Sequence, residues 1–211
     1  MTEELGLFPL GLVLVPTERI PLHIFEARYR ELVRECLDDE REFGLVLDLG
    51  GDEPAEIGTR AAVVQLLQVL PDGRMNVVVE GRARFRIVAR TAGRSFLTAE
   101  VEPVDDEDDP PEPEERERAL ASFARLVAAT GSEVGVPEPA AEQLPFELAA
   151  RIDFGNDLKQ ELLELRSPRE RLARVTELIE RAADAVERDR ELRERAGRNG
   201  KVRPFGDSSS D

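Results

Sequence analysis

Apolar and polar residues follow two different periods along the chain, and the change comes near residue 105. Before it, short apolar runs alternate with turn signals, which is typical of strands. The turn signal Pro71-Asp72-Gly73-Arg74 lies between two such runs and predicts a hairpin. The predicted strands are 43–47, 62–70, 75–79, 82–89 and 96–104.

One predicted strand carries a row of arginines. In residues 82–89, Ala83, Phe85 and Ile87 share one face, and the opposite face holds Arg82, Arg84 and Arg86. We expect the arginine face to meet water and to pair with acidic neighbours. A site for an anion is the alternative.

A helix interrupts the strands. Its apolar positions recur at i, i+3, i+4, i+7 and i+8, namely Tyr29, Leu32, Val33, Cys36 and Leu37. This spacing predicts a helix over residues 26–39. Cys36 lies on the apolar stripe, so we expect it to pack as a small hydrophobic side chain and not to act as a nucleophile with His23.

Residues 105–117 form an acidic, proline-containing segment. They hold nine acidic residues and one basic residue, which is half of the chain's net charge of −16. Like charges repel each other and proline blocks both helix and sheet, so an extended linker is predicted. The alternative is an acidic decoy or a cation-binding loop, although the segment lacks the glycine that calcium loops place at a sharp turn.

After this segment the apolar period becomes helical. Residues 148–152 and 158–165 predict short helices, and Ser167-Pro168-Arg169-Glu170 is a full start signal for a long one. The fold class is therefore α+β. Its predicted parts are a β-rich domain over 1–104, a linker over 105–117, a helical bundle over 118–197 and a disordered tail over 198–211.

Composition and motifs exclude several kinds of chemistry. The chain has one cysteine and one histidine, so metal sites built on clusters of these residues are excluded. It has neither a G-x-x-x-x-G-K-[ST] loop nor a G-x-S-x-G elbow. We expect no enzyme activity, no cofactor and no metal. Apolar runs are too short for a membrane span and no secretory signal is present, so a cytoplasmic protein without membrane contact is expected.

Several of these segments resemble the amino-terminal substrate-binding domain of Lon proteases, in that family's order and spacing. The resemblance implies a β-rich pseudo-barrel of PUA-like type followed by a helical bundle. Full Lon continues into ATPase and peptidase domains, so we expect a stand-alone, bacterial-type protein that resembles only the first part. The matching segments are 7–10, 13–16, 21–29, 43–46, 58–59, 70–73, 80–87 and 158–172.

The resemblance further implies binding of unfolded or exposed polypeptide segments, or of a protein partner, in protein quality control. Such binding needs a free sheet edge or an apolar groove. The candidate binding residues are Phe8, Phe25, Glu26, Arg28, Tyr29 and Phe85. The two charged residues open the predicted helix, and we expect them near a cleft that faces the bundle.

An RNA-binding role is the alternative function, because PUA-like folds often bind RNA. The net charge of −16 opposes it, and so does the lack of a Lys/Arg cluster with interleaved aromatic residues. No nucleic-acid partner is therefore expected.

Overall fold

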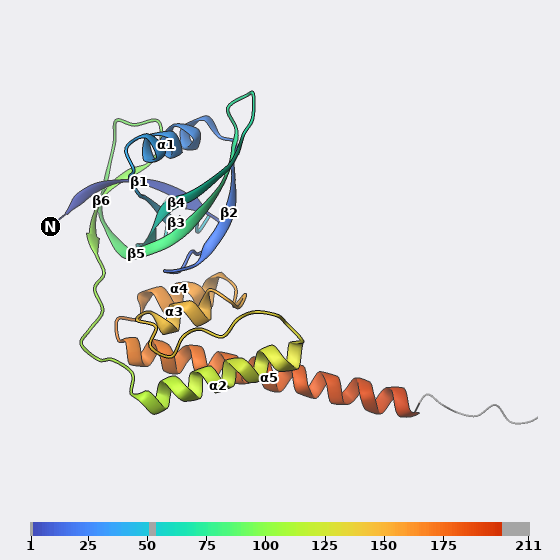
Figure 1. Ribbon diagram of the computed structural model, residues 1–211. Helices are drawn as coiled ribbons and strands as arrows, with labels where there is room; N and C mark the ends of the chain where they lie inside the picture. The colour runs from blue at the N-terminus through green and yellow to red at the C-terminus, as the bar shows by residue number, and fades with distance from the viewer. Residues whose placement is uncertain (1, 51–53, 200–211) are drawn as a thin grey trace, which may run out of the picture.

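In the computed structural model, which describes residues 2–50 and 54–199, a β-rich part and a helical part are stacked on each other (Figure 1). The fold class is α+β, and the β-rich part comes first in the chain, as the sequence predicts. Its elements are β1 (Glu3–Leu10), β2 (Arg19–Ile24), α1 (Ala27–Asp38), β3 (Phe43–Leu47), β4 (Ile57–Val69), β5 (Met75–Thr91) and β6 (Thr98–Pro103). The helical part contains α2 (Pro113–Thr130), α3 (Leu144–Ala149), α4 (Asn156–Glu164) and α5 (Pro168–Asn199).

The strands form one sheet in the order β2-β5-β4-β3-β1-β6. Strand β5 also pairs with β6, so the sheet closes on itself into a barrel. β1 and β3 are parallel, and the other pairs are antiparallel. Closure leaves β2 at one end of the sheet, paired with β5 alone in the described residues. The PUA-like character of this barrel stays a prediction.

The long strand β5 joins two strands that the sequence predicts as separate. It passes without a break through Gly81, where the loop after β1 crosses it closely. Thr17 N–H donates to the Gly81 carbonyl and Gly81 N–H donates to the Glu18 carbonyl, each at 2.9 Å. A Cβ on Gly81 would overlap the carbonyl oxygen of Val15. Only glycine lets two backbones approach this closely.

Helix α1 confirms the helix predicted over 26–39, within one residue at each end. It closes the end of the barrel that lies away from the helical part (Figure 1). Its apolar stripe is buried, as the spacing predicts, at Tyr29, Leu32, Val33 and Cys36.

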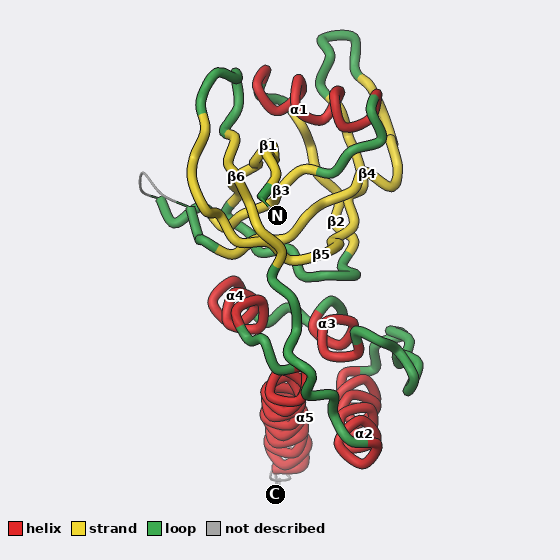
Figure 2. Tube along the Cα trace, turned by 90° about the vertical axis from the view of Figure 1, so that its left-hand side faces the viewer, coloured by secondary structure: helices red, strands yellow, loops and turns green. Residues whose placement is uncertain are grey.

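In the helical part, α2 and α5 lie side by side, and α3 and α4 lie between them and the barrel (Figure 2). Arg118 of α2 pairs with Glu180 of α5 at 2.9 Å. The apolar core of these helices also takes in Val13, Val15 and Ile57 from the β-rich part. The two parts therefore share buried surface across their contact, which we call the seam.

Helix α2 begins inside the segment predicted as a linker. Glu112 is its N-cap and Pro113 its first residue, five residues before the predicted start of the bundle. Glu112 N–H donates to the Glu115 carboxylate at 2.7 Å, and acidic side chains in the first turn favour the positive end of the helix dipole. Carboxylates that the sequence predicts to repel one another thus stabilise the start of the helix.

Helix α5 begins where the sequence predicts. Glu170 N–H donates to the Ser167 hydroxyl at 3.0 Å, which is the expected N-cap bond. The helix runs to Asn199, so the first two residues of the predicted disordered tail are helical, and residues 200–211 lie outside the described residues. No helix in the described part of the chain is long and apolar enough to cross a membrane.

Candidate functional site

Three of the six predicted binding residues belong to the core of the barrel. Phe8, Tyr29 and Phe85 are each 5% exposed or less. The Phe8 and Tyr29 rings stack with centroids 3.9 Å apart. Aromatic pairs of this kind stabilise the core, and the three rings offer a ligand little surface.

The other three predicted residues lie at the surface around the start of α1. Phe25 is 60% exposed, whereas Arg28 donates to Glu26 at 3.0 Å and lies over the Tyr29 ring. The expected cleft facing the bundle is wrong for this site, because α1 caps the end of the barrel that lies away from the helices (Figure 1). The sequence predicts where the helix starts but not which end of the barrel the helix closes.

Phe25 borders a feature that we call the hairpin arm, made of β2 and residues 62–80. Here β5 lies between β2 and β4, with Met75 opposite both Ile24 and Val69. The turn of this hairpin reaches past the start of α1 (Figure 1). Arg30 of α1 donates to the Asp72 carbonyl in the turn at 2.5 Å, which ties the tip to the helix.

Strand β4 presents apolar side chains to water along this arm. All six residues 64–69 are exposed, and four of them form what we call the apolar edge: Val64, Leu66, Leu67 and Val69. Their exposed fractions are 38–54%. Opposite Leu66 and Val69 on β5, Val77 and Met75 are fully buried. The apolar face of the arm therefore extends from the buried core to exposed side chains of β4.

The opposite face of the arm carries a polar ladder, hydrogen-bonded across its three strands beside Leu67. His23 Nδ1 donates to Asn76 Oδ1 at 2.6 Å, and Asn76 Nδ2 donates to Gln68 Oε1 at 3.2 Å. The His23 and Phe25 rings stack with centroids 6.0 Å apart. This ladder holds the three strands in register, so the apolar edge rests on a fixed frame.

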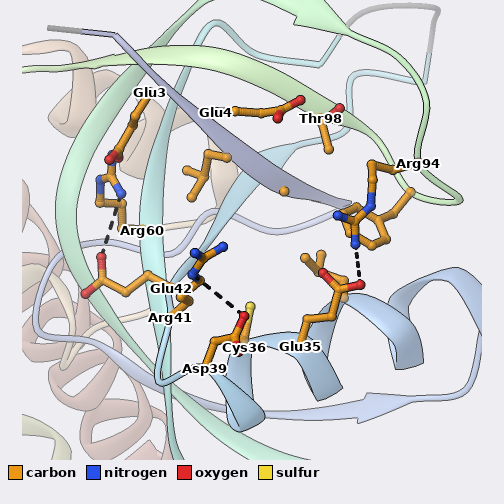
Figure 3. A pocket seen from close by; sticks show the side chains of 14 residues that line it. Glu3, Glu4, Glu35, Cys36, Asp39, Arg41, Glu42, Arg60, Arg94 and Thr98 are labelled. Atoms are coloured by element: carbon orange, nitrogen blue, oxygen red, sulfur yellow. Dashed lines mark hydrogen bonds and ion pairs between the residues drawn. The ribbon is translucent and has the colours of Figure 1, made fainter.

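A cavity of about 410 Å³ lies between β1 and the end of α1 (Figure 3). Its floor is apolar, and its arginines each have an acidic partner: Arg60 pairs with Glu3, Arg94 with Glu35 and Arg41 with Asp39. Within the described residues, no group of three or more His, Cys, Asp or Glu side chains is placed to hold a metal ion. Since each of its arginines already has an acidic partner, none of them is left free for an anionic ligand.

Cys36 in the wall of this cavity should react slowly with thiol reagents. Burial, with a smaller effect from Glu35, raises the pKa of its thiol from 9.0 to about 11. At pH 8 the thiolate fraction is then about 100-fold lower than in the unfolded chain, and only the thiolate attacks. We expect an aromatic disulfide reagent to label the folded protein at least 100-fold more slowly than the urea-unfolded protein. Similar rates in both states would show that the thiol is accessible.

The same shift predicts a stability change at high pH. The unfolded chain loses the Cys36 proton first, so the folded state loses stability as pH rises from 9.0 towards about 11. Replacing Cys36 by alanine should remove this component of the pH profile.

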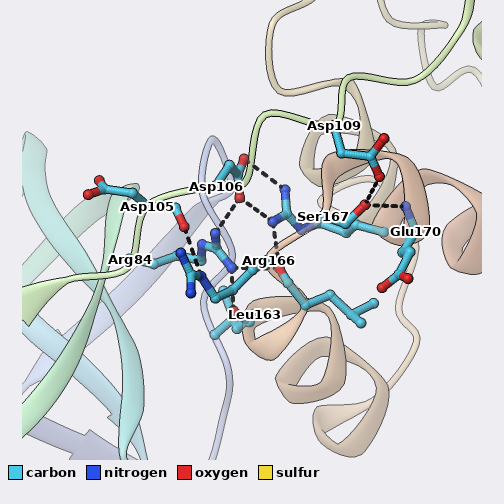
Figure 4. A network of polar contacts seen from close by, with 10 residues as sticks. Arg84, Asp105, Asp106, Asp109, Leu163, Arg166, Ser167 and Glu170 are labelled. Atoms are coloured by element: carbon cyan, nitrogen blue, oxygen red, sulfur yellow. Dashed lines mark hydrogen bonds and ion pairs between the residues drawn. The ribbon is translucent and has the colours of Figure 1, made fainter.

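The predicted water-facing arginine row is wrong for Arg84, which is 5% exposed and lies in the seam. Figure 4 shows it reaching towards Asp106 and α4. Its guanidinium donates to the Leu163 and Leu165 carbonyls at 2.6 and 2.8 Å and pairs with Asp106. Arg171, also buried, pairs with the same carboxylate. Burial, then Arg171, lower the pKa of Arg84 to about 10, against the opposing effect of Asp106.

Residues 105–108 are exposed and lie outside any helix or strand, as the predicted linker requires, but the seam network holds this stretch in place. Residues 105–109 are held against the start of α5 through Asp106 and through Asp109, which accepts from the Ser167 hydroxyl at 2.6 Å. Glu107 N–H donates to the Arg166 carbonyl at 3.0 Å. Basic side chains from distant parts of the chain neutralise this stretch, so it is a structured strap.

The comparisons with known proteins agree with this fold. Residues 4–181 match the family model for the ATP-dependent protease La (LON) substrate-binding domain. Lon protease 2 of Desulfotalea psychrophila is 31% identical over 210 residues, covering 91% of this chain and 27% of that protein. Lon protease 1 of Hydrogenovibrio crunogenus is 25% identical and covers 87% of this chain and 24% of that protein. The chain thus spans about a quarter of the length of these relatives.

Solved structures give the same result. A Lon N-terminal domain protein from Xanthomonas campestris superimposes with a TM-score of 0.64 at 29% identity, covering 82% of this chain and 96% of that one. The N-terminal domain of Lon protease from the Mycobacterium avium complex, at 19% identity, shares the fold with a TM-score of 0.63 over 84% of this chain and 98% of that one. Since the family model covers most of its length, this chain belongs to the Lon substrate-binding domain family.

Proposed function

We propose that this chain is a polypeptide-binding module whose binding surface is the apolar edge of the hairpin arm. The observation that carries the proposal is the run of six exposed residues in β4, four of them apolar. Water-exposed apolar side chains gathered on one element mark interaction surfaces more often than scattered ones do. Family membership supports a polypeptide as the ligand.

The proposed module has no catalytic step of its own. It holds clients in the cytoplasm, as part of protein quality control, by contacts that tolerate many sequences. Side-chain contacts to Leu66, Leu67 and Val69 are adaptable and give modest affinity. We expect dissociation constants in the micromolar range or weaker, about −8 kcal/mol at best.

Replacing Leu66 by aspartate should weaken binding of an unfolded polypeptide at least tenfold, because a carboxylate in the apolar edge must be desolvated by an apolar client. The measurement is fluorescence anisotropy with dye-labelled, reduced and carboxymethylated α-lactalbumin. Leu66 is 46% exposed, so the fold should persist, and circular dichroism checks this.

Leu192 on α5 provides the matched control, since it is 62% exposed and far from the arm in the chain. Its change to aspartate should leave affinity unchanged. If both variants bind as the parent does, the apolar edge is not the binding surface. Competition by single-stranded RNA that weakens with added salt would favour the RNA-binding alternative.

A further inference from the structure

Strand β4 has an edge without a strand partner along the arm. β3 pairs with β4 only at residues 59–61, whereas β5 pairs with it from Ile57 to Val69. No strand among residues 2–50 and 54–199 pairs with the other edge of residues 62–69. Such an edge presents backbone donors and acceptors that another extended chain can satisfy.

The side chains along this edge carry no charge. Residues 61–70 contain no Asp, Glu, Lys or Arg, although these make up 35% of the chain. Soluble proteins commonly protect an exposed edge with lysine or with an inward-pointing charge. Here that protection is absent over residues 64–69, where every side chain is exposed.

Bulges are the protection that remains. The pairing of β4 with β5 shifts register between Thr59 and Ala61, between Val63 and Gln65, and between Leu66 and Gln68. Each bulge bends the strand and increases its twist. Two rigid copies of this edge pair poorly because both are bent, and each chain's net charge of −16 repels the other. An unfolded segment has no fixed shape and can follow the bends.

We propose that an unfolded, uncharged polypeptide segment binds by adding as a strand along residues 64–69 of β4. This inference rests on the proposed function and specifies its mode and its preferred client. Main-chain hydrogen bonds supply sequence-independent affinity, and alternate client side chains lie beside Leu66 and Val69 on the apolar face of the arm. A charged client residue at one of these positions would be buried without an ion-pair partner. Charged segments therefore bind more weakly.

The test uses a capped, dye-labelled nine-residue peptide of alternating valine and threonine. Two derivatives carry N-methyl groups on the odd or on the even residues, because an added strand bonds to the sheet through one alternate set of its amides only. We expect one derivative to bind at least tenfold more weakly than the parent, and the other to bind like the parent.

Three further measurements examine the client, the edge and the occupant. Lysine at the central valine of the peptide should weaken binding at least tenfold, despite long-range attraction to an acidic protein. Replacing Leu67 by lysine should weaken binding of the parent peptide to a similar degree, while Leu192→Lys, the matched control, should not. In sedimentation velocity, the wild type should show no dimer that is lost in the Leu67→Lys variant.

If the two methylated derivatives bind equally, whether both bind like the parent peptide or both bind much more weakly, strand addition is overturned. The proposed function would still stand. Absence of binding by every peptide and by unfolded α-lactalbumin would overturn both. A wild-type dimer abolished by Leu67→Lys would make a second copy the occupant and overturn the inference.

Discussion

Replacing Asp106 by asparagine is expected to lower the free energy of unfolding by about 3 kcal/mol. One oxygen of this carboxylate accepts from both Arg84 and Arg171, and the other accepts from Arg171 at 3.2 Å. Both guanidiniums are buried, so asparagine would leave two cations in the seam without the carboxylate that accepts from both. The carboxylate itself is 40% exposed, which keeps the expected loss at the low end for a broken buried pair. Urea denaturation followed by circular dichroism measures it.

The matched control for Asp106 lies two residues further along the strap. Asp108 is exposed, so Asp108→Asn should leave the urea midpoint unchanged. If Asp106→Asn shifts the midpoint no more than this control does, the buried arginines are neutralised without Asp106. The seam network would then contribute little to stability.

Replacing Lys159 by methionine should destabilise the protein by a similar amount, about 3 kcal/mol. Lys159 of α4 pairs with Glu18 of the β-rich part at 2.5 Å, and the two side chains are only 13% and 10% exposed. Glu18 also accepts from Val15 N–H at 3.1 Å. Methionine fills the space of the lysine stem but leaves the carboxylate buried without its cation.

A double variant separates charge from packing. Glu18→Gln together with Lys159→Met removes both charges, while the glutamine oxygen can still accept from Val15 N–H. It should regain more than half of the stability lost by the single variant. A double variant as unstable as Lys159→Met alone would show that the loss comes from packing and not from an unpaired carboxylate.

The parts of the fold that depend on neighbouring residues were predictable from the sequence. The spacing from Tyr29 to Leu37 gives helix α1, and Ser167-Pro168 gives the start of α5. Pro71-Asp72-Gly73 gives the β4–β5 turn, where Gly73 has a φ of 83°. In each case the signal and the bond that satisfies it lie within a few residues of each other.

The seam was not predictable in this way. Asp106 meets Arg84, 22 positions earlier, and Arg171, 65 positions later. Nothing in residues 105–117 shows that cations from two other elements converge there. Local charge repulsion favours an extended linker, and the ion pairs that hold residues 105–109 in place form only in the tertiary fold.

For the candidate site, the sequence indicated Phe25, which lies across β5 from the apolar edge, and missed Leu66, Leu67 and Val69. These residues lie in a run predicted as a strand, and an apolar run in a strand is more often buried than exposed. The adjacent pair Leu66-Leu67 interrupts strict alternation and marks the bulge, but this pattern does not show which face is covered. Whether residues 64–69 of β4 are exposed depends on where the barrel ends, and the periodicity of a single strand does not show this.

The close crossing at Gly81 has a consequence for how relatives of this chain should be compared. Gly81, Phe8 and Phe85 lie in the segments that make the family recognisable, and each is fixed by packing that excludes a side chain or buries one. A bound segment at the arm would touch none of them. In the proposed binding mode, two members could share every one of these motifs and hold different clients, and differences along residues 64–69 would then be the better guide to which ones.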